Sequence, residues 1–301
     1  MTTGVLAFVA AVWGALAGTL LPRAAYRFAV PTGEPWRDRC PRGHHPVRGW
    51  LGGTACRECA GTDPLDRAPT TDVQDQAAAS DRQDRAPASD LQDQAAVSER
   101  QDRAPASDRQ DRAPAPSYAS SRAPSAPLLA TATALVCAAL AAATGTRPEL
   151  AVWLLLAPVG VLLAAVDFRV QRLPDPLTLP LAAAALALLG VAALLPEHAG
   201  HWRTALYGAL ALGAGYYLLY RVNPGGMGFG DVKLAVGTGA VLGWYGWPTV
   251  LLGTFAGFLL GALYGGALVL ARRADRRTAV PFGPFLLAGA LTGLLIGAYA
   301  A

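Results

Sequence analysis

Long runs of apolar residues, separated by short polar segments, fill the chain after residue 128. Runs of about 18 or more apolar residues with few charges are typical of membrane-spanning helices. Over the whole chain they predict eight spans, at residues 4–22, 128–145, 149–166, 177–195, 203–220, 231–246, 248–270 and 282–300. The predicted fold is therefore an all-α polytopic membrane protein in a lipid bilayer. No basic segment precedes the first run, so we predict a retained anchor rather than a cleaved signal peptide.

A polar repeat interrupts this pattern between the first two runs. Its unit has nine residues and recurs from Thr71 to Ala115 with few large apolar side chains. Such a segment cannot bury enough surface to offset the entropy of ordering it, which predicts a disordered linker, with a partner-binding tail as the alternative. The predicted divisions are a transmembrane helix at 1–22, a cytoplasmic Cys/His loop at 23–61, the repeat linker at 62–127 and a membrane domain at 128–301.

Charge is scarce and unevenly distributed. Of 301 residues, 53% are hydrophobic and 15% are charged, with a net charge of +4. Cytoplasmic loops of membrane proteins carry an excess of Lys and Arg, so the side with more of these residues is predicted to be cytoplasmic, and eight spans then place both termini outside. This asymmetry explains the positive charge without a nucleic-acid partner. The cytoplasmic side receives Arg23, Arg27, Arg37, Arg39, Arg169, Arg172, Arg221, Lys233, Arg272, Arg273, Arg276 and Arg277, and the outer side receives Arg147 and Arg203.

Three cysteines lie close together in the loop after the first span. Cys56 and Cys59 form a Cys-x-x-Cys pair, and Cys40 precedes them. Zinc takes four Cys or His ligands in tetrahedral geometry, so His44 or His45 is the candidate fourth ligand of a structural zinc site. The alternative is that these cysteines bind nothing. A disulfide is not expected in the reducing cytoplasm.

Acidic residues are rare in the membrane domain, where only six occur: Glu149, Asp167, Asp175, Glu197, Asp231 and Asp275. Glu149 and Glu197 are predicted to be exposed in short outer loops, and Asp275 lies in a basic turn. Asp175 precedes Pro176, a pattern that predicts a helix N-cap.

Asp167 and Asp231 have no such simple explanation. Asp167 ends the third span, where the partial negative charge of a helix C-terminus disfavours a carboxylate, whereas Asp231 opens the sixth span, where the helix dipole favours one. One protonated and one ionised carboxyl group, facing each other, form the arrangement that acid–base hydrolysis requires. The alternative is two separate interfacial acids paired with Arg169, Arg172 or Lys233.

Three motifs of the membrane domain resemble those of the bacterial type IV prepilin leader peptidases, which are GxGD intramembrane aspartyl proteases. The first is GFGD followed by VKLAVG, the second is VDFRVQRLPDPLTLP, and the third is VPFGPFLLAGAL. The resemblance covers about residues 128–301, with the motifs in the family's order. The matching residues are Asp167, Gly228, Gly230, Asp231, Lys233, Pro281 and Gly283.

The resemblance implies that Asp167 and Asp231 are catalytic. It implies an aspartic endopeptidase of the bacterial inner membrane that removes the leader of prepilins or pseudopilins at the cytoplasmic face, works beside pilus or secretion assembly machinery, and needs no cofactor for proteolysis. Many family members also methylate the new N-terminus with S-adenosylmethionine. Pro22 and Gly43 replace an Asn and a Cys of the family pattern, and these departures leave methyl transfer open.

Two rival hypotheses come from other functional classes. One is a catalytically silent membrane scaffold that recruits partners through the repeat. The other is a small-solute transporter, but transporters tend to place their acids near the bilayer midplane and often contain an internal repeat of the fold. The predicted position of both aspartates at one membrane face favours the peptidase.

Overall fold

The computed structural model describes residues 2–30, 35–40, 46–47, 49–53, 125–224, 227–271 and 281–301. Over these ranges the protein forms nine α-helices and no β-strand, which confirms the prediction of an all-α fold for this part of the chain. The repeat at 71–115 lies outside the described residues. The helices are α1 (Thr3–Leu20), α2 (Pro22–Phe28), α7 (Ala126–Thr144), α8 (Glu149–Val170), α9 (Asp175–Ala192), α10 (Trp202–Val222), α11 (Phe229–Gly243), α12 (Trp247–Leu270) and α13 (Gly283–Ala300).

Every predicted span has a helix at its position. Six of these helices, α1, α7, α8, α9, α12 and α13, are long and apolar enough to cross a membrane, which supports a multi-pass membrane protein. The other two are α10 and α11, and α11 has only 15 residues. At 1.5 Å per residue α11 is about 22 Å long, less than the roughly 30 Å of a hydrocarbon core.

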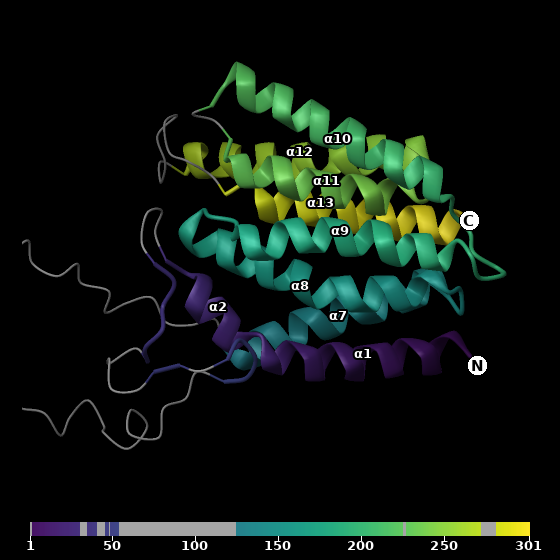
Figure 1. Cartoon of the computed structure of the whole chain (residues 1–301), viewed down its shortest axis with the longest axis horizontal. Helices are drawn as coiled ribbons and strands as arrows, with labels where there is room; N and C mark the ends of the chain where they lie inside the picture. The colour runs from purple at the N-terminus through teal and green to yellow at the C-terminus, as the bar shows by residue number, and fades with distance from the viewer. Residues whose placement is uncertain are drawn as a thin grey trace, which may run out of the picture. The chain divides into compact units, whose positions relative to one another are not determined.

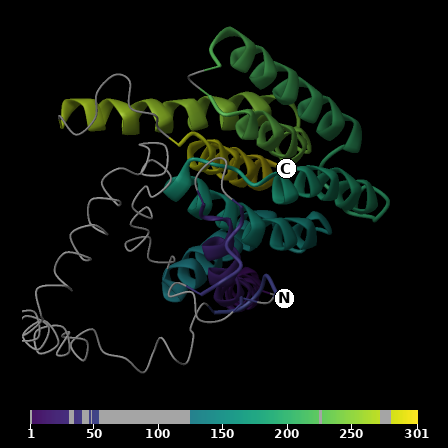
Figure 2. The ribbon, with the colours of Figure 1, turned by 60° about the vertical axis from the view of Figure 1, so that its left-hand side comes forward.

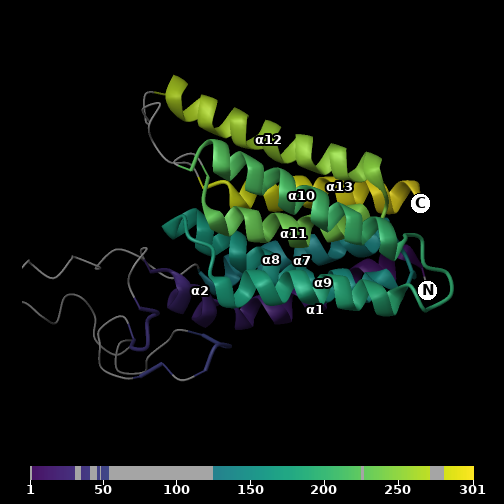
Figure 3. The ribbon, with the colours of Figure 1, turned by 45° about the horizontal axis from the view of Figure 1, so that its top comes forward.

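The helices run side by side, and both chain termini lie at the same end of the bundle (Figure 1). Helix α1 lies at one edge and α10 at the opposite edge (Figure 2). Helix α11 lies in the interior, next to α9, α10 and α13 (Figure 3). Close packing relies on glycines: a Cβ atom at Gly208 of α10 would overlap the carbonyl oxygen of Gly239 in α11, and the reverse is also true. Small residues let membrane helices approach in this way.

Glu149 contradicts its predicted exposure. It is the first residue of α8 and is fully buried. Its Oε1 atom accepts the backbone N–H of Ala199 at 3.2 Å and the hydroxyl of Tyr245 at 3.4 Å. The prediction of an exposed outer-loop carboxylate is therefore wrong, because the segment between α9 and α10 supplies a backbone donor to this side chain.

The described part of the Cys/His loop lies near the end of the bundle that is opposite to the two chain termini (Figure 1). The guanidinium of Arg172, which follows α8, lies 4.5 Å from the ring centre of Trp36. Cys40 is buried. The remaining predicted zinc ligands, His44 (or His45), Cys56 and Cys59, lie outside the described residues, so the zinc site stays a prediction.

Candidate active site

Asp167 lies in the last turn of α8, which continues to Val170, beyond the predicted end of the span. The helix ends at Gln171, whose left-handed backbone (φ 51°) lets its N–H bond to the carbonyl of Asp167 at 2.9 Å. The side chain of Asp167 is only 4% exposed. Its Oδ2 atom accepts the backbone N–H of Gly283 at 3.0 Å, which joins the end of α8 to the start of α13.

Asp231 lies in the first turn of α11, where Gly228 is the N-cap residue. Its Oδ2 atom accepts the N–H of Gly228 at 3.2 Å, and its own N–H donates to the carbonyl of Gly228 at 3.1 Å. An acid at the third helical position that bonds back to the N-cap N–H stabilises a helix start, and the helix dipole favours its negative charge. With 6% exposure, Asp231 is nearly as buried as Asp167.

Leu173, in the connection between α8 and α9, lies against the two glycines that adjoin these acids. A Cβ atom at Gly230 would lie 2.8 Å from Cβ of Leu173. A Cβ atom at Gly283 would lie 2.7 Å from Oδ2 of Asp167 and 3.5 Å from Cδ1 of Leu173. The two aspartates lie close enough for their charges to interact. The structure thus brings Asp167 and Asp231 together from α8 and α11, and it gives a steric reason for the glycines at 230 and 283.

Asp175 does not cap its helix, so that prediction is wrong. Helix α9 begins at Asp175 itself, its N-cap is Pro174, and no side chain caps it. Asp175 is thus one position after the N-cap. Its carboxylate instead pairs with Lys233, with Oδ1 2.7 Å from Nζ. This ion pair connects the start of α9 to the first turn of α11. Because 61% of the Asp175 side chain is exposed, the pair contributes at most about 1 kcal/mol to stability.

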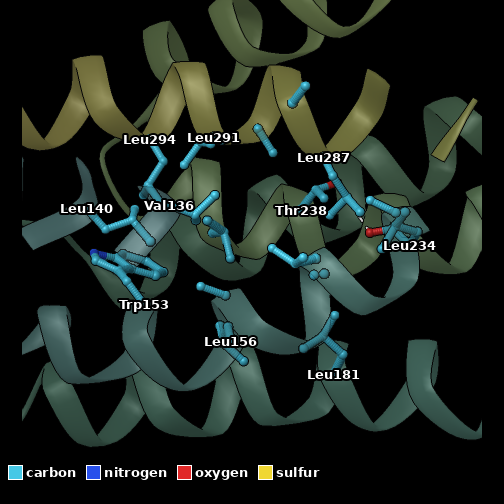
Figure 4. A pocket seen from close by; sticks show the side chains of 18 of the residues that line it. Val136, Leu140, Trp153, Leu156, Leu181, Leu234, Thr238, Leu287, Leu291 and Leu294 are labelled. Atoms are coloured by element: carbon cyan, nitrogen blue, oxygen red, sulfur yellow. Dashed lines mark hydrogen bonds between the residues drawn. The ribbon is translucent and has the colours of Figure 1, made fainter. Parts of the chain in front are cut away.

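An apolar cavity of about 270 Å³ lies among α7, α8, α9, α11 and α13. Leu234 and Leu287 lie toward one end of this cavity, and Trp153 lies toward the other (Figure 4). Thr238 contributes a lining hydroxyl, but that hydroxyl already donates to carbonyls of its own helix. Since Leu234 is one turn beyond Asp231, the cavity extends from the vicinity of the acids into the apolar interior. It offers space for a few apolar side chains and no free polar partner.

Tyr216 was not singled out from the sequence. It lies in α10 with 2% exposure, and its hydroxyl is close enough to Asp231 for the two groups to interact electrostatically. The apolar pattern gives no signal that separates Tyr216 from its neighbour Tyr217, because both belong to the same run. The packing of α10 against α11 distinguishes them, because it buries Tyr216 and leaves Tyr217 half exposed.

Residues 153–266 match the Type IV leader peptidase family. Similar proteins include the prepilin leader peptidase/N-methyltransferase of Aeromonas salmonicida (strain A449), which is 38% identical over 154 residues, or 48% of either chain. The protein of that name from Aeromonas hydrophila is 36% identical over 181 residues, covering 57% of this chain and 58% of the relative. That of Escherichia coli (strain K12) is 36% identical over 143 residues, covering 44% and 57%.

The aligned part of this chain spans about half the length of these relatives. No solved structure matches the chain. The family match begins within α8, ends within α12 and includes Asp167, Gly228, Gly230 and Asp231. Residues 153–266, which contain both buried aspartates, are therefore the part of this chain that is similar to the type IV leader peptidases.

Proposed function

We propose that this protein is a membrane aspartic endopeptidase that removes the leader peptide of prepilin-like proteins. The observation that carries the proposal is the convergence of two buried carboxylates, Asp167 from α8 and Asp231 from α11, each held by a backbone N–H. Buried carboxylates are expensive in an apolar protein, so a close pair indicates a chemical use. The relatives' name, prepilin leader peptidase/N-methyltransferase, supports the choice of substrate.

The two carboxyl groups share one proton in the resting enzyme, because two neighbouring charges repel. Asp231, at a helix N-terminus, is the ionised partner and takes a proton from a water molecule. The water oxygen bonds to the scissile carbonyl carbon while protonated Asp167 donates its hydrogen to the carbonyl oxygen. Collapse of this intermediate breaks the C–N bond, and the leaving nitrogen takes the proton that Asp231 received. One hydroxyl group of the intermediate returns its proton to Asp167 as the C=O bond forms, which restores the resting pair.

The substrate's apolar helix packs beside the bundle and places side chains in the cavity near Leu234 and Leu287. Its leader then reaches the aspartates at the cytoplasmic face of the bacterial inner membrane, where the basic loops lie. Eight crossings leave both termini outside, in agreement with their common end of the bundle (Figure 1). Pilins or pseudopilins are the substrates, and pilus or secretion assembly machinery receives the product.

A structural zinc ion in the Cys/His loop is a second part of the proposal. Cys40, Cys56, Cys59 and either His44 or His45 would hold it, and the donor set of three thiolates and one imidazole suits zinc. Elemental analysis of purified protein should find about one zinc per chain, and Cys56→Ser should remove it while leaving most of the cleavage. Protein purified without zinc and still active would remove this part of the proposal.

Methyl transfer from S-adenosylmethionine is a candidate second activity, because the relatives are named N-methyltransferases as well. The substitutions at Pro22 and Gly43 argue against it. Mass spectrometry of the cleaved pilin N-terminus tests this activity. A methylated N-terminus that appears only when this protein is present would show methyl transfer, and an unmethylated one would exclude it.

The central test is co-expression with a candidate prepilin, followed by mass spectrometry of the pilin N-terminus. Asp167→Asn and Asp231→Asn should each abolish cleavage, and the double variant should be no worse than either single variant, because the two groups act as one unit. Asp175→Asn is the matched control and should cleave. An active Asp167→Asn protein beside an inactive, properly inserted Asp175→Asn protein would contradict the assignment.

The same experiment separates the peptidase from a silent scaffold. A scaffold that works through the repeat would leave the prepilin uncut in every strain, and its partners would be lost when residues 71–115 are deleted.

A further inference from the structure

Tyr216 holds a polar group that the two-aspartate mechanism does not use. Its side chain is 2% exposed, and its hydroxyl is one of the buried side-chain atoms without a hydrogen-bond partner in the described part of the chain. A buried hydroxyl without a partner is destabilising, and native proteins rarely keep one without a reason. The position of this hydroxyl indicates what the reason is.

Helix packing places Tyr216 opposite the start of α11. Gly208 of α10 meets Gly239 of α11, and Gly213 meets Val236, so residue numbers rise along α10 as they fall along α11. One turn beyond Gly213, Tyr216 therefore faces the first turn of α11, which carries Asp231. The electrostatic interaction between Tyr216 and Asp231 agrees with this register.

Aromatic contacts fix the ring of Tyr216 in the same place. It stacks on Phe258 of α12 at 5.7 Å between ring centres, and it lies 6.0 Å from the ring of Phe282. Phe282 directly precedes Gly283, whose N–H binds Asp167. The tyrosine ring thus contacts the segment that holds one aspartate while its hydroxyl lies near the other.

We propose that the Tyr216 hydroxyl is a third catalytic group, which donates a hydrogen bond to the scissile carbonyl oxygen as negative charge develops on it. This inference rests on the proposed peptidase function. A donor already fixed in a site shielded from bulk solvent stabilises such an oxygen without reorganisation during the reaction. In the resting enzyme the hydroxyl has no partner because its acceptor belongs to the substrate.

Tyr216→Phe tests this inference with the smallest possible change, since the ring and its contacts with Phe258 and Phe282 remain. Removal of a donor to the developing charge should lower kcat by about 10²-fold while KM stays within about 2-fold of the wild-type value. Because the variant also removes a buried unsatisfied hydroxyl, its melting temperature should equal or exceed that of the wild type. Tyr217→Phe is the matched control: it changes the adjacent residue of the same helix, is 50% exposed, and should leave kcat, KM and melting temperature unchanged.

Each outcome decides the matter. A Tyr216→Phe protein with kcat within about 2-fold of wild type overturns the catalytic role. A loss of kcat that accompanies a lower melting temperature also overturns it, because a packing role then explains both changes. A wild-type protein that fails to cut prepilin at all refutes the proposed function itself, which separates that failure from a failure of the tyrosine hypothesis.

Discussion

Replacement of Gly283 by alanine tests whether the contact between α13 and Asp167 sets the geometry of the site. The N–H of Gly283 donates to Oδ2 of Asp167 at 3.0 Å, and an alanine Cβ would lie 2.7 Å from the same oxygen. Ordinary Cβ contacts begin at 3.4 Å, so the carboxylate and the backbone must separate by several tenths of an ångström. The separation weakens the hydrogen bond to the Asp167 carboxyl group, and a bond to such a neutral group contributes about 0.5–1.5 kcal/mol.

We therefore expect Gly283→Ala to lower kcat/KM by about 10²-fold, since displacement of a catalytic group by about 1 Å produces losses of that size. The assay uses purified protein in detergent with a prepilin substrate, and it follows the products by mass spectrometry. The melting temperature should fall as well, because overpacking at a tight contact costs about 1–3 kcal/mol.

Gly228→Ala is the informative comparison, because it also places a methyl group beside one of the two proposed catalytic carboxylates. There the Cβ would lie 3.5 Å from Oδ2 of Asp231, an ordinary contact, and the N–H that bonds to that oxygen is kept. The change should reduce kcat/KM by about 3-fold or less, because neither the carboxylate nor its hydrogen bond has to move, although the poorer N-cap residue should lower stability by about 0.5–1 kcal/mol. Wild-type kcat/KM in Gly283→Ala, or a larger loss in Gly228→Ala, would refute the steric argument.

Three further predictions concern other parts of the chain. Asp175→Asn breaks an exposed ion pair with Lys233, so cleavage assays should show nearly full activity and the melting temperature should change little, by less than about 1 kcal/mol in stability. Glu149→Ala leaves two part-buried donors without this acceptor and should lower stability by about 1–3 kcal/mol in total. Glu149→Gln keeps an acceptor oxygen and should melt near the wild type, so equal melting of both variants would contradict this account. Deletion of residues 71–115 should leave cleavage intact and shift stability by only about 1 kcal/mol, because loop-closure entropy varies slowly with length, and a well-inserted but inactive deletion protein would show that the repeat binds something required.

The sequence by itself determined the all-α membrane class and the positions of the long helices. Membrane spans are local features, since a run of apolar residues long enough to cross a bilayer is visible without its neighbours. The residues of the candidate site, Asp167 and Asp231, were also visible as rare acids at the ends of apolar runs, and the motif resemblance gave their predicted roles.

Tertiary structure alone decided which groups meet around these acids. The N–H of Gly283 reaches Asp167 across 116 positions of the chain, Leu173 occupies the space that Gly230 leaves, and Tyr216 turns toward Asp231 while Tyr217 turns away. These contacts depend on how each helix is rotated about its axis. Helices that are apolar on every side carry little periodic pattern to fix that rotation, so the sequence could not determine it.

Local helix starts were a second limit on prediction. Asp175 has the residue type and the following proline of an N-cap. Its helix nevertheless begins at Asp175 itself, with Pro174 as the N-cap, and its carboxylate pairs with Lys233. Glu149 likewise stands where a loop was expected, but it is buried by a segment some 50 residues away. In both cases a partner from another part of the chain decided the position of the side chain. A hydrogen-bond donor or a cation stabilises a nearby carboxylate, and the local sequence does not show where that partner lies.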